Sequence, residues 1–404
     1  MLKQARVVII GSGIVGSSIA YHLARLGWRE IVVLDQGELV SGTTSHAPGL
    51  VGQLRSSAAL TRMLMYSVSL YRTLSVDGEA GFMGEASLRV ASSKARWAQM
   101  QQQAAFAQSV GLEVHLVTAA EAGKLFPLLN LTGLEGALCL PSDGSADAVI
   151  LARSLQHEAE ELGVTFVANS RVQQIDVANS RIRAAVTQNG RIEAETVVVA
   201  AGIWSPMIGR LVGLSLPVVP MNHQYVVSTT LPELENRVVP NLRDPDGLVY
   251  FRQRGSSLVY GGYERNPVTF EDLIPEDTNP TIRSFDRTRF EPLHRAAVER
   301  VPALRSCSNL REVNGLEAFT ADGEFLLGPS SDIRGLWVAC GFCAHGVSSA
   351  GGVGKVMADW MVHGDPGLDV SAMALERFAG HARSDEEVRN GACSVYSTYY
   401  DIAP

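Results

Sequence analysis

The chain has 404 residues, of which 46% are hydrophobic and 19% are charged, and its formal net charge is −8. This length favours two domains, and the acidic balance argues against a nucleic-acid or anionic-membrane partner. No apolar run reaches the roughly 18–20 residues that span a bilayer. The five cysteines, an odd number, suggest reduced thiols. We therefore expect a soluble, cytoplasmic α/β protein.

The N-terminal region alternates strand, helix and strand. Residues 6–10 predict a buried strand, residues 16–26 a helix, and residues 31–34 a second buried strand. In this order they form a right-handed parallel unit. A helix is predicted at 59–74, and the alternation at 82–91 indicates that the chain enters a different sheet.

The remaining segments first resume the pattern of strands and helices and then change to strands separated by turns. A helix is predicted at 148–162, followed by strands at 165–167, 172–177, 182–187 and 196–200. Strand-like runs separated by turns, typical of an antiparallel sheet, follow at 223–229, 248–252 and 258–263. The last predicted elements are a strand at 335–339, a Gly/Ser-rich loop, and a helix at 351–363.

A glycine motif joins the first predicted strand to the first helix. Gly11, Gly13 and Gly16 form a G-x-G-x-x-G, in which the glycines permit the tight turn, the approach of a pyrophosphate and close helix packing. Asp35 ends the second strand, where a carboxylate accepts hydrogen bonds from ribose hydroxyls and disfavours a 2′-phosphate. The motif predicts a dinucleotide site without deciding between FAD and NAD.

Later segments favour FAD. A glycine follows the strand at 196–200, and the Gly/Ser-rich loop at 342–354 precedes a helix whose N-terminus is available to a flavin. An extended cofactor contacted at the beginning, middle and end of the chain explains all three regions. The predicted contacts in these later segments are Val172, Ala201, Gly202, Trp204, Gly341, His345 and Gly346.

Residues 41–50 place one histidine, His46, in a run of small, turn-forming residues. Such a run lets the backbone pass close to a flat group, with the imidazole as the reactive side chain facing it. The predicted cofactor contacts of this loop are Thr43, Thr44, His46, Gly49 and Leu50. The alternative is that His46 hydrogen-bonds to backbone and that the cofactor is bound non-covalently.

These residues give the chain a resemblance to the FAD-dependent amine oxidoreductases of the D-amino-acid-oxidase superfamily, closest to the flavin domain of dimethylglycine and sarcosine dehydrogenases and dimethylglycine oxidase. The likeness covers nearly the whole chain. It is carried by the glycine motif and by residues 42–50, 222–225, 249–252, 319–323 and 350–355. It implies that His46 is bonded covalently to the 8α-methyl of FAD, because a neutral imidazole nitrogen is a competent nucleophile.

The resemblance also implies that His223 and Tyr250 lie on the substrate side of the flavin. An imidazole that titrates near neutrality can take the ammonium proton, and a phenol can orient the amine or its carboxylate. The alternative is that both residues are structural. Arg55 and Arg252 are candidates for binding a substrate carboxylate by position, although a surface or structural role is the favoured interpretation of each arginine taken singly.

The expected fold is a mixed α/β fold with a Rossmann-like FAD-binding domain and an inserted antiparallel-sheet substrate domain. The FAD-binding domain is discontinuous, and the predicted segments are 1–80, 141–215 and 310–375 for this domain, 81–140 and 216–309 for the substrate domain, and 376–404 for a C-terminal tail. Cys340 and Cys343 form a C-x-x-C, but one such pair is too few ligands for zinc, so no metal site is expected.

The leading functional prediction is oxidation of an N-methylated amino acid by hydride transfer to FAD, which gives an iminium that hydrolyses and releases formaldehyde. The alternatives are oxidation of a cyclic or D-amino acid such as a proline derivative, and a catalytically silent regulatory subunit. The expected partners are the amine and an electron acceptor, either oxygen or an electron-transfer protein. Many relatives continue into a folate-binding domain near the point where this chain stops, so a separate folate-binding partner is also possible. Residues 84–88 depart from the usual pattern of the family, which leaves the exact amine open.

Overall fold

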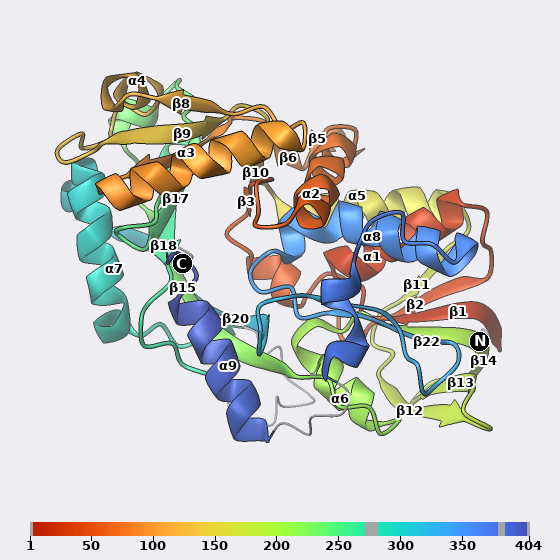
Figure 1. The fold of residues 1–404 in the computed structure, drawn as a ribbon. Coiled ribbons are helices and arrows are strands. Elements are labelled where there is room, and N and C mark those ends of the chain that lie inside the picture. Colours follow the sequence, from red (N-terminus) through yellow and green to blue (C-terminus); the bar gives the residue numbers. More distant parts are fainter. Residues whose placement is uncertain (1–2, 271–281, 379–383, 402–404) are drawn as a thin grey trace.

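The computed structural model describes residues 3–270, 282–378 and 384–401. The parts of the predicted substrate domain at 271–281 and of the predicted tail at 379–383 and 402–404 lie outside the described residues. The chain forms two large sheets side by side, one of eight and one of nine strands (Figure 1). Since parallel and antiparallel pairing both occur, the predicted mixed α/β class is confirmed.

The eight-stranded sheet contains the N-terminal strand–helix–strand unit. Its order is β11-β2-β1-β14-β13-β12, with β22 beside β14 and β21 beside β22. The pairs around β1 are parallel, whereas β12, β13 and the first part of β14 form an antiparallel meander. The strands are β1 (Gln4–Ile10), β2 (Ile31–Leu34), β11 (Thr165–Val167), β12 (Val172–Val177), β13 (Ile182–Thr187), β14 (Gly190–Val199), β21 (Leu326–Pro329) and β22 (Leu336–Cys340).

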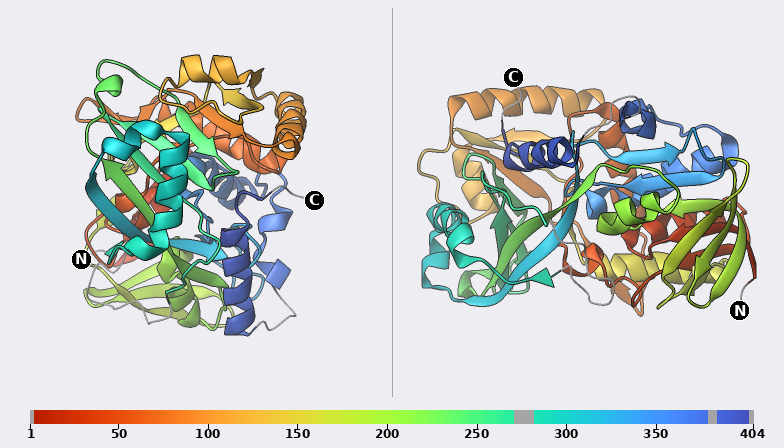
Figure 2. Two further views of the ribbon diagram at one scale, coloured as in Figure 1. Left: turned by 90° about the vertical axis from the view of Figure 1, so that its left-hand side faces the viewer. Right: turned by 90° about the horizontal axis from the view of Figure 1, so that it is seen from below.

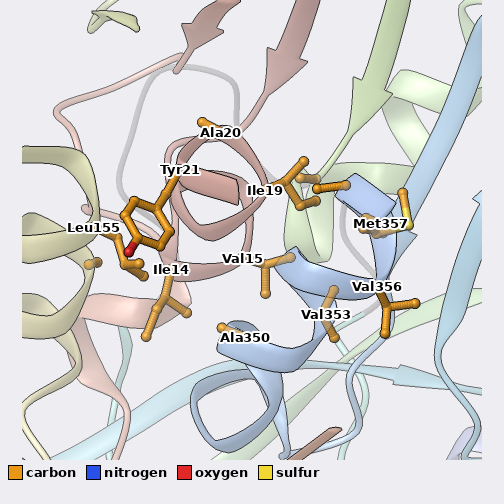
Figure 3. Packing of buried hydrophobic residues seen from close by; sticks show 14 of the residues in the cluster. Ile14, Val15, Ile19, Ala20, Tyr21, Leu155, Ala350, Val353, Val356 and Met357 are labelled. Atoms are coloured by element: carbon orange, nitrogen blue, oxygen red, sulfur yellow. The ribbon is translucent and has the colours of Figure 1, made fainter. Parts of the chain in front are cut away.

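Three helices cover one face of this sheet: α1 (Ile14–Arg25), α5 (Ala148–Glu161) and α8 (Gly346–His363) (Figure 1). β1 is buried on both faces because its side chains alternate between two clusters, with Val7 facing the helices and Val8 the meander. Figure 3 shows Val15 and Ile19 of α1 beside Val353 and Met357 of α8. The helices approach closely because a Cβ on Gly354 would collide with Ser18 of α1.

The nine-stranded sheet has the order β19-β20-β15-β18-β17-β16-β7-β9-β8 and is antiparallel except between β16 and β7. The predicted boundary at residue 310 does not coincide with the change of sheet, because β20 pairs with β15 along its length. The strands are β7 (Ser87–Ala91), β8 (His115–Val117), β9 (Gly136–Leu140), β15 (Val218–Ser228), β16 (Asn241–Asp244), β17 (Val249–Arg254), β18 (Ser257–Gly262), β19 (Ile282–Arg283) and β20 (Asn309–Thr320).

Helices surround the second sheet, and the C-terminal region joins it. The sequence showed no clear periodicity after residue 385, yet this region forms α9, which packs along β15 and β20 (Figures 1 and 2). None of the helices in the described residues is both long and apolar enough to cross a membrane. The helices around the second sheet are α3 (Lys94–Ser109), α4 (Ala119–Leu125), α7 (Arg287–Arg300) and α9 (Asp385–Ser397). The remaining two, α2 (Ala58–Tyr71) and α6 (Ser205–Arg210), contact α8 and β14, respectively.

Short elements complete the fold. The short strands are β3 (Leu50–Val51), β6 (Phe82–Met83) and β10 (Gly144–Ala146), which form one small sheet, and β4 (Ser75–Val76) and β5 (Glu79–Ala80), which pair with each other. The 3-10 helices are η1 (Thr43–His46), η2 (Gly202–Trp204), η3 (Pro232–Leu234), η4 (Pro302–Ser306), η5 (Ser371–Met373) and η6 (Leu375–Phe378).

Candidate active site

A cavity of about 990 Å³ is lined by residues of both large sheets. One end lies at the turn between β1 and α1, and the other reaches the face of the nine-stranded sheet that carries Tyr250. Most of the predicted cofactor contacts line this cavity. They are Gly11, Gly13, Asp35, Thr43, Thr44, Gly49, Leu50, Val172, Ala201, Gly202, Trp204 and Gly346.

The β1–α1 turn leaves bare backbone at the nucleotide end. Gly11 has a φ of 111°, and a Cβ at this position would collide with the carbonyl oxygen of Ala200. Asp35 fixes the turn, because its carboxylate accepts hydrogen bonds from the Ser12 N–H at 2.8 Å and the Ser12 hydroxyl at 2.7 Å. The turn is therefore held open for a phosphate before any ligand arrives.

Four predicted cofactor residues do not belong to the described residues that line the cavity: Gly16, His46, Gly341 and His345. Gly16 serves helix packing, as its place in the motif predicts, since a Cβ there would collide with the Gly11 carbonyl oxygen. Gly341 packs against Thr320. His345 turns its ring toward Tyr399, with Nδ1 3.4 Å from the phenol oxygen.

His46 lies at the margin of the cavity. Its neighbours Thr44 and Ala47 line the cavity, while its own ring packs over Gly315 of β20, where any side chain would collide with it. His46 Nε2 lies 3.4 Å from the Leu316 carbonyl oxygen, and Nδ1 has no hydrogen-bond partner among the described residues. Burial lowers the pKa of His46 to about 4, so the imidazole is neutral at neutral pH.

At the opposite end, one face of the nine-stranded sheet presents polar side chains to the cavity. His223 of β15 stands directly opposite Gly315 of β20, and Glu317 projects from the same face two residues further along β20. Gly261 of β18 leaves room for the Tyr250 phenol, because a Cβ there would collide with its oxygen. Two glycines thus create the space in which Tyr250 and His46 lie.

His223 and Tyr250 are brought together as the resemblance implied. The Tyr250 hydroxyl lies 2.8 Å from His223 Nε2, and the two rings stack with centroids 5.8 Å apart. Tyr250 lines the cavity and His223 lies behind it. The expectation of an imidazole that titrates near neutrality is wrong, since burial lowers the pKa of His223 to about 3. In the resting protein His223 is therefore neutral.

Two arginines converge at the substrate end, and only one of them was expected. Arg55 and Arg243 both line the cavity, and a guanidinium nitrogen of each would lie 3.7 Å from a Cβ placed on Gly52. The buried Asp143 carboxylate lies beside the same position, with Oδ2 3.3 Å from it. Arg55 Nε has no hydrogen-bond partner among the described residues, so this end is prepared for an anionic group.

Arg252 does not line this cavity, contrary to the expectation that it binds substrate. Its Nη1 donates hydrogen bonds to the Pro48 carbonyl oxygen at 2.7 Å and to the Ala146 carbonyl oxygen at 2.9 Å. Arg252 therefore supports the backbone of the His46 loop. Its guanidinium packs so closely against Gly49 that a Cβ there would collide with it.

The sequence reasoning also missed other residues that line the cavity, among them Tyr263, Glu317 and Tyr399 near Tyr250. The rings of Tyr263 and Tyr399 stack with centroids 3.9 Å apart. Burial raises the pKa of Glu317 to about 8, and its Oε2 has no hydrogen-bond partner among the described residues. Two features of the sequence could have indicated two of these residues. Glu317 is an acid inside an apolar strand, and Tyr399 is one of several aromatic residues near the C-terminus.

Of the C-x-x-C pair, Cys343 lines the cavity and Cys340 does not. Cys340 and Cys343 are buried and unbridged, and burial raises the pKa of their thiols to about 12 and about 11. Within the described parts of the chain, no group of three or more His, Cys, Asp or Glu side chains is arranged to hold a metal ion.

Residues 6–360 match the family model described as DAO, FAD dependent oxidoreductase. The chain belongs to this family. It is 33% identical over 410 residues to the mitochondrial sarcosine dehydrogenase of Homo sapiens, a match that covers 99% of this chain and 44% of that protein. It is also 33% identical over 385 residues to the mitochondrial dimethylglycine dehydrogenase of Rattus norvegicus, covering 93% and 45%. The chain thus spans less than half the length of these curated relatives.

A solved structure with the same fold is the L-proline dehydrogenase of P. horikoshii, with a TM-score of 0.85, 22% identity, and coverage of 94% of this chain and 98% of that one. The fold and the cofactor of the family are thereby established as those of an FAD-dependent oxidoreductase related to amine-oxidising enzymes.

The cavity fits FAD on structural grounds. Bare backbone at Gly11 and Gly13 suits a pyrophosphate, and the N-terminus of α8 at Gly346 faces the same space. Trp204 lines the cavity, and its indole N–H has no hydrogen-bond partner among the described residues, which leaves a donor available to a ligand. The extension of the cavity to Tyr250 suits a long cofactor whose ring system reaches the substrate end.

Proposed function

We propose that this protein oxidises an N-methylated amino acid at the end of the cavity that Arg55, Arg243 and Tyr250 line. The observation that carries this proposal is the arrangement of one continuous cavity, with a nucleotide cradle at one end and two convergent guanidinium groups at the other. A small amine with a carboxylate complements the second end, because guanidinium groups bind carboxylates through charge-assisted hydrogen bonds. The similarity to sarcosine and dimethylglycine dehydrogenases supports the same substrate class.

Each residue of the substrate end has a distinct task in this proposal. Arg55 and Arg243 hold the carboxylate and thereby fix the position of the nitrogen. Tyr250, hydrogen-bonded to His223, accepts the proton of the ammonium group so that the nitrogen lone pair becomes available. Bound FAD supplies the acceptor for the hydride that leaves the carbon next to nitrogen. The resulting iminium hydrolyses in water to the demethylated amine and formaldehyde.

The substrate class is tested by anaerobic flavin reduction with dimethylglycine, sarcosine, L-proline and D-proline. We expect the N-methylated amino acids to bleach the flavin absorbance, with formaldehyde formed on turnover. Reduction by cyclic substrates alone would overturn the demethylation proposal. If no amine bleaches the flavin, a regulatory role is favoured instead.

The electron acceptor is identified by comparing oxygen consumption with the reduction of an electron-transfer protein. A folate-binding partner would be indicated if formaldehyde were trapped only when tetrahydrofolate and a second protein are added.

We further propose that His46 holds FAD covalently. The support is a neutral, buried imidazole at the cavity margin whose Nδ1 has no hydrogen-bond partner among the described residues. Acid precipitation of the purified protein should leave the flavin with the pellet, and His46→Ala should release it to the supernatant. Ser45→Ala, which removes an exposed neighbouring hydroxyl, is the matched control and should keep the flavin bound. Yellow supernatant from the unaltered protein would contradict this attachment.

A further inference from the structure

A series of hydrogen bonds runs from the cavity to a buried carboxylate. The Tyr250 hydroxyl lies 2.8 Å from His223 Nε2, His223 Nδ1 lies 2.9 Å from the Tyr396 hydroxyl, and Tyr396 donates to Glu264 Oε2 at 2.9 Å. Of these four residues, Tyr250 alone lines the cavity. All are buried, and Glu264 is 8% exposed. The side chains come from β17, β15, α9 and the segment that follows β18.

The hydrogens in this series all point in one direction. A carboxylate can only accept, so Tyr396 must donate its single hydrogen to Glu264 and accept from His223 Nδ1–H. A neutral imidazole carries one N–H, so His223 Nε2 must accept from the Tyr250 hydroxyl. Burial keeps the ring neutral by lowering the pKa of His223 to about 3. Every donor therefore faces away from the cavity and toward Glu264.

We propose that this series is a proton relay, and that Glu264 is the final acceptor of the proton that leaves the substrate amine. The proposal rests on the proposed function. The ammonium group gives its proton to the Tyr250 oxygen, and the original Tyr250 proton moves to His223 Nε2. The His223 Nδ1 proton moves to Tyr396, and the Tyr396 proton moves to Glu264. One proton leaves the substrate and one arrives at Glu264, while the three groups between them end neutral.

The surroundings of Glu264 suit a base that is charged at rest and accepts a proton during the reaction. Arg289 Nε lies 2.8 Å from Glu264 Oε1 and stabilises the carboxylate. Burial, together with Asp286, raises the pKa of Glu264, and burial together with the Glu264 carboxylate raises the pKa of Glu317. The Tyr396 phenol of α9 donates a hydrogen bond to the same carboxylate. Burial favours the protonated form of Glu264, whereas the Arg289 cation favours the charged form. Glu264 can therefore both accept the proton and release it again.

Glu317 is the competing acceptor, because it lines the cavity and its Oε2 has no hydrogen-bond partner among the described residues. Its position, however, is outside the aligned series, and a hydrogen bond from Tyr250 or His223 to Glu317 does not occur in the described structure. The two carboxylates make different predictions, so substitution of each separates them.

The kinetic test compares Glu264→Gln, Tyr396→Phe and Glu317→Gln in the holoenzyme by anaerobic flavin reduction as a function of pH. Glutamine can still accept from Tyr396, and phenylalanine keeps the ring contacts while losing the hydroxyl. We expect Glu264→Gln and Tyr396→Phe to slow reduction on the order of 100-fold and to remove its decline toward acidic pH. Glu312→Gln, near the exposed end of the same β20, should match the unaltered protein.

A second measurement does not depend on turnover. Sarcosine is added to chemically reduced holoenzyme, which cannot oxidise it, and an infrared difference spectrum reports whether a carboxylate becomes a carboxylic acid. The band of a protonated carboxyl should appear in the unaltered protein and in Glu317→Gln, and should be absent in Glu264→Gln and Tyr396→Phe. A band lost only in Glu317→Gln, or an unchanged pH profile in Glu264→Gln with intact amine oxidation, overturns the relay while the proposed function stands. Failure of every amine to reduce the unaltered protein overturns both.

Discussion

At the nucleotide end of the cavity, the contacts come from main-chain turns close to a single sequence motif, whereas at the substrate end they come from side chains on separate strands. The turn at Gly11 and Gly13 needs only the adjoining β1, α1 and Asp35 to hold its shape. By contrast, the group around Tyr250 combines β15, β17, β20 and α9. Under the proposed function, the first end would hold the FAD that the family shares, and the second end would select a particular amine.

The two ends of the cavity also differ in the charged groups that they contain. Backbone N–H groups and a helix N-terminus would hold the phosphates of bound FAD, so the nucleotide end needs no buried cation. The substrate end brings Arg55, Arg243 and Glu317 into one region, and the two half-buried guanidinium groups carry a desolvation cost that the carboxylate of a zwitterionic ligand would offset. We therefore expect substitutions at the first end to abolish cofactor binding, and substitutions at the second end to change affinity, rate or pH dependence.

The largest effect is expected for Gly11→Ala. The new methyl group would collide with the Ala200 carbonyl oxygen at a φ of 111°, which costs roughly 2–4 kcal/mol of folding free energy and closes the turn to a phosphate. The purified variant should contain little or no FAD and should unfold at lower urea concentration. Gly27→Ala is the matched control, since Gly27 also has a positive φ but meets nothing within 4 Å, and it should retain FAD. A fully loaded Gly11→Ala protein would contradict this account of the turn.

The nucleotide end could be predicted from sequence because its determinants are local. A strand, three glycines, a helix and an acid occur within 35 residues, and each requires only its neighbours. The predicted strand β2 and the helices α1 and α5 were found within two residues of their expected bounds. The start of α8 at Gly346 and that of β14 at Gly190 lie five and six residues before the predicted starts, so part of the predicted Gly/Ser-rich loop is helical. The resemblance added His223 and Tyr250, whose hydrogen bond the structure contains.

The substrate end was less predictable because its residues meet through the register of distant strands. Arg252 seemed as suitable as Arg55 by position, but β17 directs it toward the Pro48 carbonyl and away from the cavity. Arg243 reaches the cavity from β16, a strand that the sequence did not indicate. Tyr396 was hidden in a region without apparent periodicity, since the helix α9 gains its apolar partners only by packing on β15 and β20.

An intermediate effect is expected for Arg243→Gln. Loss of one guanidinium removes a charge-assisted contact worth about 2–3 kcal/mol, so KM for the amine should rise roughly 30- to 150-fold with a smaller change in kcat. Steady-state kinetics with sarcosine or dimethylglycine measures the change. Arg252→Gln is the control for a buried arginine outside the cavity, and should lower stability while leaving KM close to that of the unaltered protein. An unchanged KM in Arg243→Gln, or an equal rise in both variants, would argue against carboxylate binding by Arg243.

The smallest effect concerns the pH dependence of stability at Glu317. Its folded-state pKa of about 8 lies above the ordinary value of 4.5, so the folded protein binds this proton more tightly than the unfolded chain does. The resulting stabilisation is fully present below about pH 4.5 and is lost as the pH rises through about 8. Glu317→Gln keeps a neutral side chain throughout, so its stability relative to the unaltered protein should improve by about 1–3 kcal/mol between these limits, an amount reduced from the full shift because Glu317 faces a cavity. Urea unfolding at both pH limits measures the difference, with Glu312→Gln as the control on the same strand. If the gap between Glu317→Gln and the unaltered protein does not change with pH, Glu317 is not held neutral by burial, and the substrate end would carry a permanent negative charge beside its two arginines.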